Sequence, residues 1–161
     1  MSNDLWQTPQ EIYDALDAEF HFTLDVACNR QNCKCPRGLY YETVDALKID
    51  WVKWSLGGAC WMNPPYSPGN IPKFCEKAYE ESQRGCTVVA ILPGDGSTGW
   101  FQNQVLSAHE YRYCKRRVRF VNPETGKKGG SPTFCSVIAV WKPGEVEDPR
   151  VSVWDWKEVM A

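Results

Sequence analysis

Residues 58–66 read Gly-Ala-Cys-Trp-Met-Asn-Pro-Pro-Tyr, and they carry the clearest indication of the architecture. The first five residues form a short apolar run, which is typical of a strand buried in a parallel sheet. Proline lacks the N–H that a sheet ladder needs, so we expect this strand to end at Met62. The residues that follow would then lie at the carboxyl end of the strand, where open α/β sheets bind ligands.

Other segments extend this pattern into an alternation of strands and helices. Further strands are expected at residues 22–27, 39–41, 86–92, 111–121 and 134–141. Helices are expected from Thr8, over residues 72–84 and from Ser97, and residues 122–130 are expected to form an exposed hairpin loop. Such an order predicts an α/β doubly wound sheet, mostly parallel, with a C-terminal antiparallel hairpin.

The start of the first helix has a capping signature. Thr8 stands at the N-cap position, Pro9 at the first helical position, and Glu11 three residues after the threonine. This spacing predicts a capping box in which the Thr8 and Glu11 side chains bond backbone N–H groups.

The composition indicates a single domain. The chain has 161 residues, of which 43% are hydrophobic, enough for one proper core. We expect a catalytic domain over residues 1–142 and an acidic tail, residues 143–161, that packs on it. No segment has the apolar length of a signal peptide or a membrane span, so we expect a cytoplasmic protein with no membrane partner.

Eight cysteines could form either a disulfide framework or a set of reduced thiols. Without a secretory signal, reduced thiols are expected. Cys28, Cys33 and Cys35 lie close together with His21 upstream, which raises the possibility of zinc. Their spacing lacks the second paired knuckle of structural zinc sites, so packing is the favoured interpretation and no metal is expected.

The segment Asn63-Pro64-Pro65-Tyr66 is suited to gripping a planar amine. Two prolines remove backbone donors and stiffen the chain, so the Asn63 side-chain oxygen and the Pro64 carbonyl can each accept one amine hydrogen. These bonds would draw the nitrogen lone pair toward an electrophile, while Tyr66 stacks on the ring. The segment therefore predicts methyl transfer onto nitrogen, although Pro-Pro also occurs in plain surface turns.

Charge is uneven along the chain although the net charge is only −2. Residues 112–128 hold seven basic side chains and one acid, whereas acids dominate after Pro143. The basic segment is a candidate for binding phosphate, with a charged solvent-facing edge strand as the alternative.

Five motifs follow one another along the chain: Trp6-Gln7-Thr8-Pro9, residues 22–27, Asp50-Trp51, residues 63–66 and Arg117-Val118-Arg119-Phe120. Together they resemble the phage-type DNA N-6-adenine methyltransferases of the Dam family, and a phage-encoded chain of this kind is expected in the host cytoplasm. The resemblance spans nearly all of residues 4–142. It implies a class I, Rossmann-like fold that uses S-adenosylmethionine, and transfer of its methyl group to the N6 amine of a flipped adenine in double-stranded DNA.

The resemblance also implies the cofactor site. It places Asp25 at the methionine end of the cofactor, with Ala27 and Asn29 in a turn that lacks the usual glycines. Thr8 and Pro9 lie over the methionine moiety, and Asn63 adjoins it. Asp50 and Trp51 hold the cofactor adenine at the end of a strand. For the ribose, Glu42 and Asp45 are both candidates, and Asp45 is preferred.

For DNA, the resemblance implies that the basic hairpin faces the target base and that Phe120 stacks on the face of adenine opposite Tyr66, although core packing would equally explain Phe120. The expected DNA contacts are Ser67, Arg116, Arg117, Arg119, Phe120, Lys127 and Lys128. Two alternatives stay open: methylation of an RNA base amine or a protein glutamine amide, and a non-enzymatic, cysteine-rich nucleic-acid-binding module. No target-recognition domain is visible, so a short or relaxed recognition sequence is expected.

Overall fold

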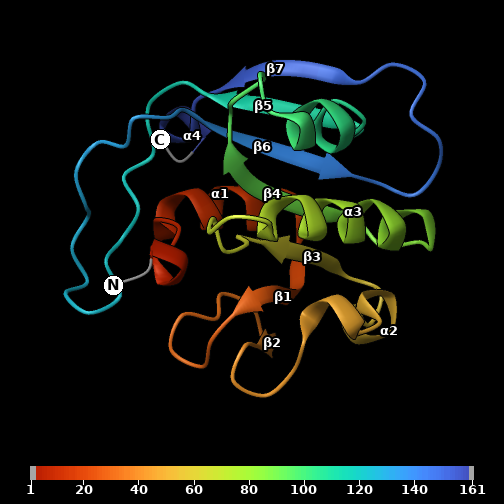
Figure 1. The fold of residues 1–161 in the computed structure, drawn as a ribbon, viewed down its shortest axis with the longest axis horizontal. Coiled ribbons are helices and arrows are strands. Elements are labelled where there is room, and N and C mark those ends of the chain that lie inside the picture. Colours follow the sequence, from red (N-terminus) through yellow and green to blue (C-terminus); the bar gives the residue numbers. More distant parts are fainter. Residues whose placement is uncertain (1–2, 160–161) are drawn as a thin grey trace.

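One seven-stranded sheet organises the chain, and the computed structural model describes residues 3–159 of it (Figure 1). The strands are β1 (Phe22–Cys28), β2 (Arg37–Tyr40), β3 (Ala59–Met62), β4 (Val88–Pro93), β5 (Glu110–Cys114), β6 (Ser136–Trp141) and β7 (Arg150–Trp154). Their spatial order is β2-β1-β3-β4-β6-β5-β7.

Most of the sheet is parallel. β1 pairs in parallel with β2 and β3, β3 with β4, and β5 with β7. β6 alone runs antiparallel to its neighbours β4 and β5. The predicted mostly parallel α/β sheet with an antiparallel pair near the C-terminus is therefore confirmed.

The antiparallel pair differs from its prediction in two ways. β5 ends at Cys114 rather than at Val121, so the connection to β6 is a long loop over residues 115–135. After β6 the chain returns to add β7 as an edge strand beside β5. Residues 150–159, expected within an acidic tail, therefore extend the sheet with β7 and end in α4 (Trp156–Val159).

Helices cover both faces of the sheet. Besides α4 they are α1 (Gln10–Phe20), α2 (Trp51–Ser55) and α3 (Asn70–Gln83), with short turns of 3-10 helix at Asn3–Leu5 and Ala46–Lys48 and of π-helix at Phe101–Val105. The helix predicted from Ser97 is thus present but short, with helical backbone over residues 99–105. No helix in residues 3–159 has the length and apolar content needed to cross a bilayer.

Side chains that point alternately to the two faces of the sheet divide the core into two layers. In β3, Cys60 and Met62 pack with α2 and α3, while Ala59 and Trp61 pack with α1 on the other face. Side chains of a strand point alternately to the two faces, so burial of both sets explains why this strand is apolar throughout.

The predicted capping box at Thr8 is wrong. α1 begins at Gln10 with Pro9 at the N-cap position, and no side chain caps it. The buried Thr8 Oγ1 has no hydrogen-bond partner among the described residues, and Glu11 instead forms an ion pair with Lys128. A tertiary ion pair therefore engages the Glu11 side chain, and Thr8 is buried without capping the helix.

Candidate active site

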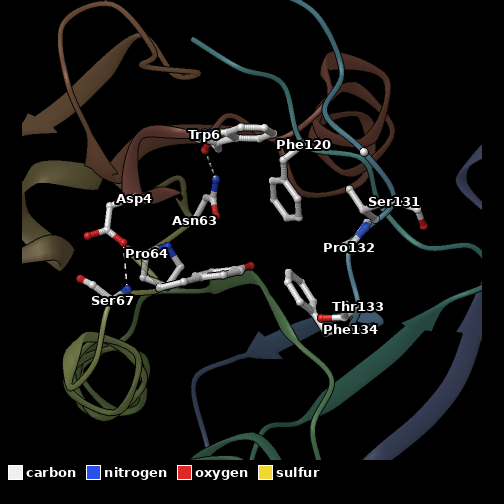
Figure 2. Close-up of a pocket in the computed structure, with 13 residues that line it drawn as sticks. Asp4, Trp6, Asn63, Pro64, Ser67, Phe120, Ser131, Pro132, Thr133 and Phe134 are labelled. Atoms are coloured by element: carbon white, nitrogen blue, oxygen red, sulfur yellow. Dashed lines mark hydrogen bonds between the residues drawn. The ribbon is translucent and has the colours of Figure 1, made fainter. Parts of the chain in front are cut away.

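The carboxyl end of β3 delivers residues 63–66 to the wall of a cavity of about 600 Å³. The N-terminal segment contributes Asp4 and Trp6 to this wall, and the loop over residues 115–135 contributes the opposite side. Figure 2 shows Asn63 and Pro64 on one side of the space, with Phe120, Pro132 and Phe134 on the other. We call this space the large cavity.

The Asn63 amide is held in one orientation. Its Nδ2 donates to the Trp6 carbonyl oxygen at 3.3 Å, as Figure 2 shows, which leaves Oδ1 as an acceptor. Within residues 3–159, no hydrogen bond occupies Asn63 Oδ1 or the Pro64 carbonyl oxygen. The segment thus presents two acceptors beside the large cavity, which is the arrangement that an NH2 group requires.

Tyr66 forms an aromatic corner with two phenylalanines. Its hydroxyl donates to the Ile91 carbonyl at 2.9 Å, and burial raises its pKa well above the usual value, so the donor stays protonated. The Tyr66 ring centroid lies 6.0 Å from that of Phe120 and 6.1 Å from that of Phe134, at interplanar angles of 75° and 63°. Because Tyr66 and Phe120 meet edge to face, they do not form the expected pair of parallel plates.

A narrow cavity of about 10 Å³ adjoins the large one and shares Asp4, Trp6 and Asn63 with it. Its remaining lining is mostly polar and includes Gln7, Thr8, Asp25, Ala27, Asn32, Lys34 and Trp61. The large and narrow cavities therefore meet at the Asn63 side chain.

Asp25 is the central charged group of the narrow cavity. Its carboxylate is 2% exposed and accepts from the backbone N–H groups of Ala27 and Lys34 at 3.1 and 3.0 Å. Burial raises the pKa of Asp25 to about 6, and the two N–H bonds oppose that rise. The residues 29–34 loop closes over this carboxylate through the Lys34 amide.

The amino-acid sequence of this chain matches a known protein family. The family model described as DNA N-6-adenine-methyltransferase (Dam) matches residues 1–160. The chain belongs to this Dam family. The family predicted from the sequence is therefore confirmed.

Two phage proteins illustrate the similarity within the Dam family. One is a DNA N-6-adenine-methyltransferase of Haemophilus phage HP1, 33% identical, with 96% of this chain and 90% of the relative covered. Another, of the same description, comes from Escherichia phage T1 and is 31% identical, with 89% of this chain and 66% of the relative covered.

Two of the residues expected to hold the cofactor adenine are placed differently in this Dam-family chain. Asp50 does not follow a strand; it caps α2 by accepting from the Lys53 N–H at 2.9 Å and pairs with Arg84 at 2.8 Å. Trp51 is fully buried and donates to the Ala46 carbonyl. The expected strand end is therefore wrong, and neither residue lines the large or the narrow cavity.

The remaining expected cofactor residues fall into two groups. Thr8 and Ala27 line the narrow cavity with Asp25 and Asn63, and Pro9 is buried directly after Thr8. Asn29 bonds the backbone of its own turn at Gln31 and Asn32, and Asp45 caps the 3-10 turn at Leu47. Local backbone donors thus occupy the side chains of the second group.

Most of the expected DNA-contacting arginines brace the protein itself. Arg116 pairs with Asp155 at 2.5 Å, Arg117 donates to the Pro132 carbonyl at 2.8 Å, and Arg119 donates to the Gly129 carbonyl at 2.7 Å. Arg112, in the same basic segment, is buried between Glu19 and Glu110. The Arg117 and Arg119 bonds connect the two halves of the loop over residues 115–135, and Arg116 ties the start of this loop to Asp155.

Several residues that line the large cavity were not expected from the sequence. Asp4 accepts from the Ser67 N–H at 2.8 Å, and Trp6 fixes Asn63 through its carbonyl. Phe134 was assigned to a strand but stands just before β6 and faces Tyr66. Trp6 could have been identified as a cavity residue, because it belongs to one of the motifs that resemble the family. No local sequence pattern identifies Asp4 or Phe134 as cavity residues.

Proposed function

We propose that this protein transfers a methyl group from S-adenosylmethionine to the N6 amine of adenine in double-stranded DNA, after the adenine has flipped into the large cavity. Membership of the Dam family supports adenine in DNA as the substrate. The single observation that carries the mechanism is the placement of the free Asn63 and Pro64 oxygens beside a cavity of about 600 Å³.

Polarisation of the amine is the role of Asn63 and Pro64. Each oxygen accepts one hydrogen of the N6 amine, which directs the nitrogen lone pair away from the ring. Asn63 is no strong base, so the amine attacks with both hydrogens in place and a proton leaves to solvent afterwards. Catalysis by this chain is then mostly alignment of the reacting atoms.

The aromatic corner recovers part of the energy that base flipping requires. Removal of a base from the duplex costs a few kcal/mol. Tyr66 stacks on the flipped adenine, while Phe120 and Phe134 present the edges that bound the base laterally. The hydroxyl bond from Tyr66 to Ile91 keeps its ring in place for this contact.

S-adenosylmethionine, when bound, supplies a methyl group made electrophilic by its sulfonium. The polar lining of the narrow cavity fits such a ligand, because Thr8 Oγ1 is buried without a partner among the described residues and Asp25 presents a buried carboxylate. We assign Thr8, Asp25, Ala27 and Asn63 to it. A space of about 10 Å³ holds no more than about one water molecule, so the donor needs more room than the narrow cavity has in this structure.

Glu42 is the better candidate for the cofactor ribose. It follows the end of β2 by two residues, and its carboxylate accepts from the Arg30 N–H at 3.4 Å, above the β1–β2 connection. Asp45, which the sequence favoured, uses its carboxylate to cap a helical turn. The sheet is proposed to be of the class I methyltransferase type, with ligands at the carboxyl ends of β1, β2 and β3.

DNA contacts are assigned to the side chains that remain exposed around the large cavity. Lys127 is exposed without a salt bridge among the described residues, and Arg117 and Arg119 combine bonds to the loop with exposed positions. Such side chains bind phosphate and hold the duplex while the base leaves it. Ser67 begins the connection from the large cavity to α3.

Transfer of labelled methyl groups tests the proposal. Duplex DNA, the same duplex with N6-methyladenine at every adenine, RNA of equal sequence and a glutamine-containing protein are incubated with labelled donor, and the products are hydrolysed and separated. We expect N6-methyladenine from the unmodified duplex alone. Equal labelling of RNA, or label in glutamine, would defeat the DNA assignment, and absence of donor binding would favour a non-enzymatic module.

A further inference from the structure

A carboxylate and two thiols converge at the carboxyl end of β1. Asp25 and Cys28 belong to the strand, and Cys33 comes from the loop that follows it. One carboxylate oxygen and the two sulfur atoms all lie within 4.8 Å of one another. His21, the ligand that the sequence suggested, lies at the opposite end of β1. We call Asp25, Cys28 and Cys33 the thiol cluster.

The sulfur atoms of the thiol cluster are packed tightly against β2. Gly38 pairs with Asp25 across the parallel ladder, and a Cβ atom at Gly38 would stand 2.5 Å from Cys33 Sγ and 2.7 Å from Cys28 Sγ. Only a residue without a side chain leaves room for both sulfurs at this place. The positions of the two thiols are therefore set by the sheet as well as by the loop.

No cation among the described residues is in direct contact with the charge of Asp25, on which Lys34 acts only from a distance. Among residues 3–159, no ion pair reaches its buried carboxylate, and the nearby Lys34 ammonium instead donates to Gln10 Oε1 at 2.8 Å. Two backbone N–H groups use one lone pair on each carboxylate oxygen, which leaves a further lone pair on each. A buried carboxylate without a cation in direct contact is unfavourable, so a cation at this place would stabilise it.

We propose that Asp25, Cys28 and Cys33 form a binding site for a thiophilic divalent cation of the Zn²⁺ type. Two thiolates and one carboxylate match the donor atoms and the number of protein ligands that zinc takes in sites with an open position, and water supplies the fourth ligand. Binding converts two thiols to thiolates, so two protons leave to solvent for each ion bound. Mg²⁺ and Ca²⁺ prefer all-oxygen ligands and do not bind here.

A second thiol pair in the chain serves as an internal comparison. Cys60 Sγ and Cys86 Sγ lie 3.2 Å apart, but both residues are buried in the core and no carboxylate or imidazole joins them within the described residues. Cys33, by contrast, is partly exposed and gives an ion a route to the thiol cluster. Access and ligand number thus favour the thiol cluster.

Titration of the reduced, chelator-treated full chain with Co²⁺ and Cd²⁺ tests the site without any use of methyl transfer. We expect one equivalent to bind, with a sulfur-to-metal charge-transfer band, release of two protons, and no response to Mg²⁺. Native mass spectrometry with Zn²⁺ supplies the stoichiometry independently. The outcome is separate from the proposed function, because neither DNA nor the methyl donor is present. Asp25 is assigned to both ligands, so the cation and the donor would bind in place of one another.

Three variants connect the signal to the thiol cluster. Cys33→Ser changes a partly exposed residue, and we expect it to lower affinity at least about tenfold, since loss of even an outer-shell partner weakens metal sites by roughly 10–100-fold. Asp25→Asn, which keeps the side-chain shape, should weaken binding while the thiolate band persists. Cys135→Ser is the matched control, because Cys135 is also partly exposed but lies outside the thiol cluster.

Three results would overturn the assignment. The first is unchanged binding in Cys33→Ser with its native fold retained by circular dichroism. The second is loss of the band in Cys60→Ala instead. The third is absence of binding to a native chain whose thiols are shown to be reduced.

Discussion

Asn63 meets both cavities through one side chain: its Nδ2 is tied to the Trp6 carbonyl, and its Oδ1 is left to accept. One hydrogen bond of 3.3 Å thus orients the amide, so that its nitrogen anchors the side chain and its oxygen remains available to the substrate amine. The N-terminal segment is thus a positioning element for the proposed amine acceptor. Tyr66 is held in a comparable manner through Ile91.

Replacement of Asn63 should separate these two roles. In Asn63→Ala the amine loses one of its two acceptors, and loss of one such preorganised group lowers kcat by roughly 100–1000-fold. Asn63→Asp keeps an acceptor but cannot donate to Trp6, so its activity should lie between alanine and wild type. Single-turnover rates on an adenine duplex measure both. Equal rates for Asn63→Ala and wild type would remove Asn63 from the mechanism.

Replacement of Tyr66 should affect the base far more than the methyl donor. Stacking on an aromatic ring is worth about 1–3 kcal/mol per base, so Tyr66→Ala should lower kcat/KM by roughly 5- to 150-fold. Binding of S-adenosylmethionine, measured by calorimetry, should stay close to wild type, because Tyr66 lines the large cavity but not the narrow one. Tyr66→Phe is the control that keeps the ring. Loss of donor binding and transfer together would show that Tyr66 is structural.

At the scale of elements, the loop over residues 115–135 forms one side of the large cavity and is bound to the N-terminal segment. Gln7 and Val121 exchange backbone hydrogen bonds of 2.9 and 2.8 Å, and Lys128 pairs with Glu11 at the start of α1. Trp6 packs against Gly129 so closely that a Cβ there would stand 2.1 Å from its ring. Segments more than a hundred residues apart thus close the large cavity together.

A methyl group at Gly129 should disrupt the contact between this loop and the N-terminal segment. Gly129→Ala collides with the Trp6 ring, and overpacking of this kind costs typically about 1–3 kcal/mol. We expect a lower melting temperature and reduced methyl transfer, because Trp6 also positions Asn63. Gly130→Ala is a matched control, since its Cβ meets no atom within 4 Å. Calorimetry measures the melting temperature and initial rates measure methyl transfer for both variants. Equal losses of stability and activity in the two would contradict a role for the contact between Trp6 and Gly129.

At the scale of the whole molecule, the acidic C-terminal segment and the basic segment neutralise each other in part. Asp155 lies just after β7 and pairs with Arg116 at 2.5 Å and Lys115 at 3.2 Å. Those partners lower the pKa of Asp155 to about 2, with the hydrogen bond from Arg116 as the main cause. β7 lies beside β5, so these ion pairs join the end of the chain to the start of the loop over residues 115–135.

Acid should weaken this junction in a defined window. The folded pKa of Asp155 is below the unfolded value of about 3.9, so its contribution to stability is present above about pH 4 and is lost as pH falls toward 2. Asp155→Asn should therefore unfold at a lower urea concentration than wild type at pH 7, and the gap should close between pH 4 and 2. Asp148→Asn, an exposed acid without a salt bridge among the described residues, is the control. A gap that persists at pH 2 would contradict the prediction.

The local sequence pattern by itself determined the strands β1, β3 and β4 and the helix α3, with Gly85 just beyond its end. It also determined that the Asn63–Tyr66 segment follows a strand end. Apolar runs and prolines act on the residues next to them in the chain, so their effects can be read from the sequence. Tertiary structure alone decided which polar side chains are available. Thr8 is buried without a partner among the described residues, Asp50 pairs with Arg84, and Arg116 pairs with Asp155. Burial and these two ion pairs depend on segments that are distant in the chain, and propensity and spacing hold no information about such contacts.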